Sequence, residues 1–339
     1  MPERVLLTGA GGFIGAHVLE HLLIHTDWRV TCVDSFRHKG KCDRIARVIA
    51  ESPDPDGWRQ RTDVVTHDLA APFSGMETER IGRADLVIAM ASLSHVDTSL
   101  ADPVPFVRNN VDLMLNTLEL CRQIRPEMVI LMSTDEVYGP VEPGYAHQEW
   151  APILPSNPYA ASKAAQEAIA ISYWRSYGVP VVIVNGMNLF GEMQDQEKFA
   201  PKVLRKVLRG ETVQIHGTPG NIGSRHYMHA RNLADALLFL ATATRAYTWP
   251  QYDRTARWNV AGAEAVSNLV FARMIAEAAE KELRYELVDF HSARPGHDPH
   301  YGLDVTLMTD LGWQPPVPLA ESLARMVQWT MKRPEWLEE

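Results

Sequence analysis

Short apolar runs alternate with longer amphipathic stretches through the first half of the chain. Apolar runs of strand length, set between helical stretches, are typical of a parallel sheet whose two faces are covered by helices. We therefore expect an α/β fold on a doubly wound parallel sheet. The predicted strands cover residues 4–8, 29–33, 63–66, 85–90, 128–133 and 179–184, and the predicted helices cover residues 13–25, 103–124 and 159–177.

The alternation loosens after Val184, which predicts a smaller C-terminal α/β lobe. The Pro-rich stretch 140–158 lacks periodicity and is expected to form a long loop, a feature that is often functional in compact domains. Residues 247–257 are predicted to form a surface connection. The later elements are expected to be helices 200–209, 231–244, 266–280 and 319–329, with a strand at 258–260.

A glycine-rich stretch, Thr8-Gly-Ala-Gly-Gly-Phe-Ile-Gly15, follows the first predicted strand and opens the first predicted helix. There, Gly9 permits a tight turn, Gly12 lets backbone N–H groups approach a diphosphate, and Gly15 allows close packing. This predicts a Rossmann-type dinucleotide site; a glycine turn without a ligand is the alternative. The expected cofactor contacts are Gly9, Gly12, Phe13, Ile14, Gly15, Asp34, Ser35, Asp68, Leu69, Met90 and Ala91.

The choice between NAD and NADP depends on Asp34, which closes the second predicted strand about twenty residues after Gly15. A carboxylate there can accept hydrogen bonds from a ribose diol and repels a 2'-phosphate, so NAD is expected. Arg37 and Lys39 could accommodate that phosphate, which leaves NADP as the alternative.

Two further motifs suggest proton transfer. Tyr159 and Lys163 are four residues apart and share one face of a predicted helix, so the ammonium can stabilise a phenolate and lower the pKa of the tyrosine. Asp135 and Glu136 end a predicted strand and supply an acid and a base, as an elimination requires. Side chains alternate along an extended segment, so both carboxyls reach one substrate only if the chain bends there; surface carboxylates are the alternative.

The charge balance excludes some functions. The formal net charge is −9, with scattered Lys and Arg, which argues against a nucleic-acid surface. Three cysteines without paired spacing fit a reducing compartment, and no apolar run approaches the ~18 residues of a membrane span. The first predicted strand also begins near the N-terminus. We therefore expect a soluble, cytoplasmic protein without a metal site.

With these motifs in place, the chain resembles the extended short-chain dehydrogenase/reductases that act on nucleotide sugars, and among them the dTDP-glucose 4,6-dehydratases. Related epimerases and decarboxylases share the Tyr and Lys but usually lack the Asp-Glu pair. The resemblance rests on 8–15, Ser94-His-Val-Asp97, Asn110-Val111, 133–139, 156–163, Gln196-Glu-Lys198, Asn259 and Arg294-Pro-Gly-His-Asp298.

The resemblance implies a role for each residue of the two motifs. Tyr159 takes the proton of the sugar 4-hydroxyl while hydride passes from C4 to a tightly held NAD+, and Thr134 orients the hydroxyl. Lys163 holds the cofactor ribose and lowers the pKa of Tyr159, so both residues also count as cofactor contacts. Glu136 then removes the C5 proton, Asp135 protonates the departing 6-hydroxyl, and hydride returns to C6. A nucleotide-diphosphate hexose would thus become its 4-keto-6-deoxy derivative.

The resemblance also implies a domain division and a homodimer. Residues 1–187 with about 227–262 would bind NAD, and about 188–226 with 263–339 would bind the nucleotide sugar. Helices 103–124 and 159–177 would form a four-helix dimer contact. The expected substrate contacts are His95, Asn188, Lys198, His216, Arg225, Asn259 and His297.

The chain departs from the family pattern mainly on the substrate side. Asn185 replaces an Arg that is frequent in the family, Leu93 replaces a Glu, and the segments 187–192 and 225–229 are altered. The elimination is therefore better supported than the identity of the sugar. Three alternatives stay open: a 5,6-dehydratase, a 4-epimerase or decarboxylase, and a non-catalytic NAD(H) sensor.

Overall fold

The larger part of the chain is built on one parallel sheet. A computed structural model describes residues 2–142, 144–243, 254–289 and 300–338. Seven strands pair in the order β12-β6-β5-β4-β1-β2-β3, all parallel, which confirms the expected fold class. The strands are β1 Arg4–Thr8, β2 Arg29–Asp34, β3 Thr62–Thr66, β4 Leu86–Ala89, β5 Met128–Thr134, β6 Val181–Gly186 and β12 Ala256–Val260.

Alternate residues of each strand feed two separate cores, because successive side chains point to opposite faces of a sheet. Leu7 of β1 packs with α1 and α9, whereas its neighbour Leu6 packs with α6 and α7. The helices of the first face are α1 Phe13–His25, α2 Cys42–Ala50, α3 Pro55–Arg61 and α9 Ala230–Ala243; those associated with the second are α4 Gly75–Ile81, α5 Val96–Ala101, α6 Pro103–Ile124 and α7 Pro158–Tyr177.

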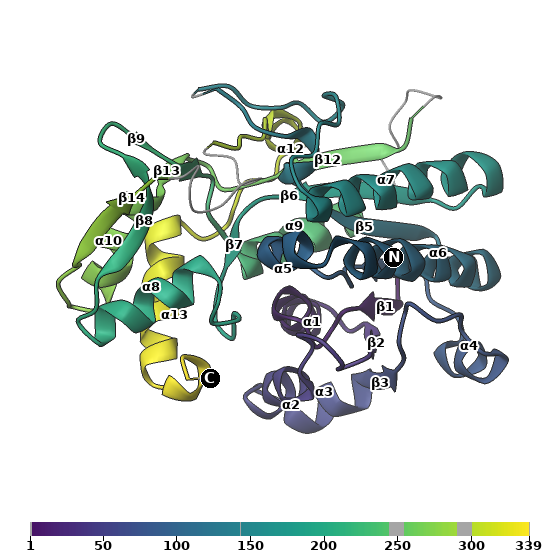
Figure 1. The fold of residues 1–339 in the computed structure, drawn as a ribbon. Helices are drawn as coiled ribbons and strands as arrows, with labels where there is room; N and C mark the ends of the chain where they lie inside the picture. The colour runs from purple at the N-terminus through teal and green to yellow at the C-terminus, as the bar shows by residue number, and fades with distance from the viewer. Residues whose placement is uncertain (1, 143, 244–253, 290–299, 339) are drawn as a thin grey trace.

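A smaller lobe lies beside the end of the sheet (Figure 1) and has its own apolar core. Its parallel pair β8 and β14 packs with helices α8, α10 and α13. The chain enters it after β6 and returns to the sheet through α9 and β12. The elements are β7 Leu189–Phe190, α8 Phe199–Leu208, β8 Val213–Thr218, β9 Asn221–Ile222, β10 Ser224–Arg225, β11 Met228–His229, β13 Val266–Ser267, α10 Asn268–Ala278, β14 Tyr285–Val288, α13 Leu319–Met331 and η3 Pro334–Trp336. Helix α12 Thr306–Asp310 packs instead against β12 of the sheet, where Met308 joins the core that holds α1 and α9.

Two sequence predictions are wrong in this region. The helix expected from residue 266 begins at Asn268, because Val266 and Ser267 pair with β10 as strand β13, and the Ser267 hydroxyl caps the helix. The surface connection expected at 247–257 lies mostly outside the described residues. Its last residue, Arg257, belongs to β12 and is only 1% exposed.

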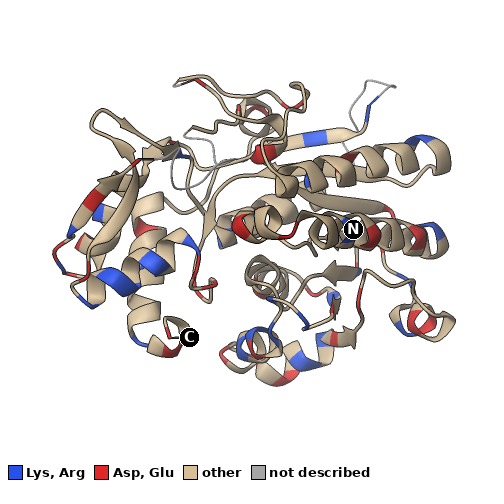
Figure 2. Ribbon diagram, in the orientation of Figure 1, with Lys and Arg blue, Asp and Glu red and all other residues tan. Residues whose placement is uncertain are grey.

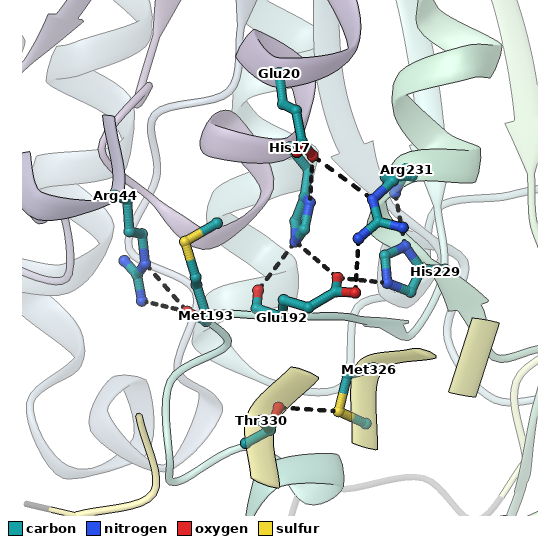
Figure 3. A network of polar contacts seen from close by, with 9 residues as sticks. All are labelled: His17, Glu20, Arg44, Glu192, Met193, His229, Arg231, Met326 and Thr330. Carbon is teal, nitrogen blue, oxygen red and sulfur yellow. Dashed lines mark hydrogen bonds and ion pairs between the residues drawn. The ribbon is translucent and has the colours of Figure 1, made fainter. Parts of the chain in front are cut away.

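A buried polar cluster ties helix α1 to the segment that enters the smaller lobe (Figure 3). The His17 ring donates through Nε2 to the Glu192 carbonyl at 3.0 Å. The Glu192 carboxylate accepts from His229 at 2.9 Å and from Arg231 at 2.6 Å. Arg44 of α2 is fully buried and donates to the Met193 carbonyl at 2.9 Å. Arg44 also donates to the Gly11 carbonyl at 3.1 Å, so it joins the glycine turn before α1 to the same segment.

Figure 2 shows acidic and basic residues interspersed along the helices of both parts, in keeping with the scattered charges of the sequence. Within the described parts of the chain, every helix is too short or too polar to traverse a bilayer.

Candidate active site

A single cavity of about 730 Å³ collects nearly all of the predicted site residues. It is lined by residues of the sheet part and of the smaller lobe. This is the expected position for a ligand site in an open α/β sheet, at the carboxyl ends of the parallel strands. The predicted residues that line it are Gly9, Gly12, Phe13, Ile14, Gly15, Asp34, Ser35, Asp68, Leu69, Met90, Ala91, His95, Thr134, Asp135, Glu136, Tyr159, Lys163, Asn188, Lys198, His216 and Arg225.

The glycine turn has the backbone that its sequence predicts. Gly9 has a positive φ of 71°, and a Cβ there would lie 2.9 Å from the Ala91 Cα, so a larger residue would clash with the end of β4. Gly12 precedes α1, whose first N–H groups lack partners within the helix and face an anion favourably. This cradle fits a dinucleotide diphosphate.

Asp34 stands at the end of β2 and is held by two backbone donors. Its carboxylate accepts from the Gly11 N–H at 3.0 Å and from the Phe36 N–H at 2.9 Å. The two nearby cations are already paired, because Arg37 contacts Asp68 at 2.7 Å and Lys39 contacts Glu197 at 2.8 Å. The position of the Asp34 carboxylate, which would repel a 2'-phosphate, favours NAD over NADP.

The required bend after β5 is present. The chain leaves the strand at Thr134 and forms the short 3-10 helix η1 Asp135–Tyr138, so the carboxyls of Asp135 and Glu136 both line the cavity. The Thr134 hydroxyl donates to Asp135 Oδ1 at 2.9 Å, whereas the buried Oδ2 has no hydrogen-bond partner among the described residues. Burial, and then the charge of Glu136, raise the pKa of Asp135 to about 7. Asp135 is therefore poised to donate a proton near neutral pH.

Tyr159 and Lys163 lie on the first turns of α7, which Asn157 caps by accepting from the Ala160 N–H at 2.9 Å. Burial, and then the charge of Glu136, raise the pKa of Tyr159, and a hydrogen bond with the Thr134 side chain opposes the shift.

The Lys163 ammonium donates to the Met132 carbonyl at 2.7 Å and to Gln166 at 2.6 Å, and burial lowers its own pKa to about 8. The expected lowering of the pKa of Tyr159 by Lys163 stays a prediction.

Among the described residues, one predicted substrate contact, Asn259, does not line the cavity. Asn259 is fully buried and its amide donates to the carbonyls of His147 at 2.9 Å and Asp304 at 3.2 Å, so it serves the fold. His297 lies outside the described residues. Arg225, by contrast, lines the cavity and its guanidinium lies 4.7 Å from the ring centroid of Tyr301.

Asn268 is a cavity residue that the sequence reasoning missed. It opens α10 directly after β13, which pairs with the strand that carries Arg225. The Tyr227 hydroxyl donates to Asn268 Oδ1 at 2.7 Å. Because this oxygen is occupied, Asn268 can offer a ligand its amide nitrogen as a hydrogen-bond donor. Asn259 follows Trp258 on β12, whereas Asn268 follows Ser267 at the end of β13. Neither residue stands in a motif of fixed spacing, so the sequence does not show that Asn259 is buried and that Asn268 lines the cavity.

With this geometry in place, comparison with known proteins is informative. The sequence model of the NAD dependent epimerase/dehydratase family matches residues 5–253. The chain belongs to this family. Family membership agrees with the glycine cradle and with the Tyr159 and Lys163 pair, but it spans both epimerases and dehydratases.

Several similar members of the family are dehydratases. The chain is 31% identical to a dTDP-glucose 4,6-dehydratase of Streptomyces griseus, over 100% of this chain and 97% of the relative. It is 30% identical to a trifunctional UDP-glucose 4,6-dehydratase, 3,5-epimerase and 4-keto-L-rhamnose reductase of Arabidopsis thaliana. The match covers 99% of this chain but only 48% of that relative, so the chain spans about half the length of the plant protein.

A solved structure gives the same fold. The dTDP-glucose 4,6-dehydratase DesIV of Streptomyces venezuelae, solved with NAD bound, superposes with a TM-score of 0.84. The match covers 99% of each chain at 28% identity.

Proposed function

We propose that the protein is an NAD+-dependent dehydratase that converts a nucleotide-diphosphate hexose into its 4-keto-6-deoxy derivative. The proposal rests mainly on the acid and base pair Asp135 and Glu136, which directly follows β5. Asp135 is 4% exposed, has one carboxyl oxygen without a partner among the described residues, and sits beside Glu136 in the cavity that also holds Tyr159. An epimerase that only oxidises and reduces C4 has no use for this pair.

The glycine turn, Asp34 and Lys163 line the same cavity and suit an NAD cofactor. The glycine turn would receive the diphosphate, Asp34 the adenosine ribose, and Lys163 the nicotinamide ribose. NAD+, when bound, accepts hydride from the sugar and returns it. The relatives' names and the NAD-bound neighbour support this assignment.

The first step needs a base at the sugar 4-hydroxyl. Tyr159 fits this role because its hydroxyl group shares the cavity with Thr134, whose hydroxyl can orient the same sugar oxygen. The pKa of Tyr159 is raised in the protein alone, so the phenolate must be stabilised in the complex. The positive charge of a bound NAD+ nicotinamide ring and the Lys163 ammonium would both stabilise the phenolate of Tyr159.

The second step eliminates water across C5 and C6. Once C4 is a ketone, the C5 proton becomes acidic and Glu136, held by the Asn157 amide at 3.1 Å, removes it. Asp135 donates its proton to the 6-hydroxyl as that group leaves as water. With a pKa of about 7, Asp135 keeps the proton until it is needed near neutral pH and regains it afterwards.

The smaller lobe would hold the nucleotide. Arg225 suits a grip on the diphosphate, Asn268 can donate from its amide to the same group, and Lys198 and His216 would flank the base. We also propose the division of the chain into an NAD part and a nucleotide-sugar lobe, a homodimer through α6 and α7, and a cytoplasmic location.

Incubation with dTDP-glucose and UDP-glucose, the substrates in the names of the relatives, tests the proposal. Loss of one water with the appearance of a 4-ketosugar would support it, and NMR of the product distinguishes a 4-keto-6-deoxy sugar from a 5,6-ene. In Glu136→Gln, we expect reduced cofactor to accumulate while exchange of the C5 proton with solvent stops. Glu79→Gln on exposed α4 is the control. Retained substrate mass with inverted C4 would show an epimerase instead.

A further inference from the structure

A buried carboxylate, that of Glu167, holds the end of β5, from which the chain enters η1. Glu167 of α7 is fully buried, and its Oε1 accepts from the Ser133 hydroxyl at 2.5 Å and from the Asn185 amide at 2.8 Å. The same amide donates to the Thr134 carbonyl at 3.0 Å. The backbone that leads into Asp135 is thus fixed to Glu167.

Arg257 of β12 supplies the opposite charge. Its Nη2 donates to Glu167 Oε2 at 2.7 Å, and the two side chains are 1% and 0% exposed. Its Nη1 donates to the Tyr138 hydroxyl at 3.2 Å, and its guanidinium lies 4.4 Å from the ring centroid of Trp150. A buried carboxylate without such a partner is strongly unfavourable, so Glu167 depends on Arg257.

Arg257 therefore reaches both ends of the turn that carries the acid and the base. It acts through Glu167 on Ser133 and Thr134 before the turn, and directly on Tyr138, the last residue of η1. Arg257 itself is not among the cavity residues. The Tyr138 hydroxyl also donates to the Glu149 carbonyl at 2.8 Å, which joins the long loop after η1 to the same network.

We propose that Arg257 is a positioning residue for the dehydration, which holds Asp135 and Glu136 in register with Tyr159 through Glu167 and Tyr138. This inference rests on the proposed function. Asn185 stands on the neighbouring strand β6, at the position where the family frequently has an Arg. Asn185 pairs with Asn259 and Ile183 pairs with Arg257 across the two strands. In this protein the guanidinium that reaches Glu167 therefore comes from β12. A misplacement of about 1 Å in such a site can cost on the order of 100-fold in rate.

The test compares two variants with a matched control. Arg257→Gln leaves Glu167 without its ion-pair partner and can fail to fold, so the neutral double variant Arg257→Gln with Glu167→Gln is made beside it. The control is Arg254→Gln, because Arg254 also lies over the Trp150 ring but is exposed.

We expect the neutral double variant to fold, to keep KM within about threefold, and to lose kcat by about 10- to 100-fold. Wild-type kcat in the double variant, or a higher KM at constant kcat, would overturn the positioning role.

Amide hydrogen exchange of peptides from residues 128–139 provides a readout that needs no substrate. Exchange at 134–138 should be faster in the neutral double variant than in the wild type and unchanged in Arg254→Gln. Unchanged exchange in the double variant would refute the positioning role whatever the enzyme's activity. Faster exchange in a protein that turns over no nucleotide sugar would instead refute the proposed function.

Discussion

Substitution of Asp135 by Asn separates the elimination from the oxidation that precedes it. Because the pKa of Asp135 is raised to about 7, the wild-type side chain is about 90% protonated at pH 6, about half at pH 7 and about 10% at pH 8. The dehydration rate should therefore fall with an apparent pKa near 7. The C4 oxidation, which does not use this proton, should not follow that profile.

Asp135→Asn preserves size and the bond from Thr134 but cannot deliver a proton. Loss of a positioned acid typically costs about 100- to 10,000-fold, so we expect that loss in product formation while the C5 proton still exchanges with solvent. Quenched-flow mass spectrometry in D2O measures both quantities. Asp63→Asn on the exposed edge of the sheet, where Asp63 pairs with Arg80 at 3.3 Å, is the control.

The same substitution should stabilise the fold at high pH. A folded-state pKa near 7 lies about three units above the usual value, so the folded protein binds this proton more tightly than the unfolded chain. The native state loses stability as the pH rises from about 4 to 7, by at most about 4 kcal/mol. Asp135→Asn should recover part of this at pH 8 and little at pH 4. Wild-type dehydration in the variant, or an equal effect on stability at both pH values, would refute the reasoning.

Three further predictions concern separate parts of the molecule. Tyr159→Phe should lower the rate of cofactor reduction by about 100- to 10,000-fold. An undiminished rate under single-turnover conditions would show that another residue is the base. Asn268→Ala should raise KM for the nucleotide sugar several-fold with little change in thermal stability, whereas Asn259→Ala should lower the melting temperature, and calorimetry with steady-state kinetics would expose the reverse pattern. Burial lowers the pKa of His229 to about 4, although Glu192 opposes this, so stability is lost as the pH falls from about 6.5 to 4; His229→Gln should lose less between pH 7 and pH 5 in urea unfolding.

The sheet and its crossover helices could be read from the sequence because apolar runs and helical periods are local signals. The glycine turn and the Tyr159 and Lys163 pair follow from fixed spacing for the same reason. The bend at η1, by contrast, was only a requirement of the chemistry, and the short strand β13 has too few residues to carry a pattern.

Residues whose roles depend on tertiary packing were misplaced. Asn259 was expected at the substrate, yet its neighbours on β12 place it in the interior, whereas Asn268 lines the cavity. Arg257 was expected on the surface, as the last residue of the connection 247–257. Its burial requires Glu167, which is 90 residues away in the sequence and becomes its partner only when β12 joins β6.

Transfer of a label from C4 to C6 tests the central claim most directly. The enzyme is incubated with dTDP-glucose or UDP-glucose that carries deuterium at C4, and the product is examined by NMR. The account predicts loss of water, deuterium at C6 and a solvent-derived hydrogen at C5. Deuterium retained at C4 in a product of unchanged mass, or left on the cofactor beside a 5,6-ene, would contradict it.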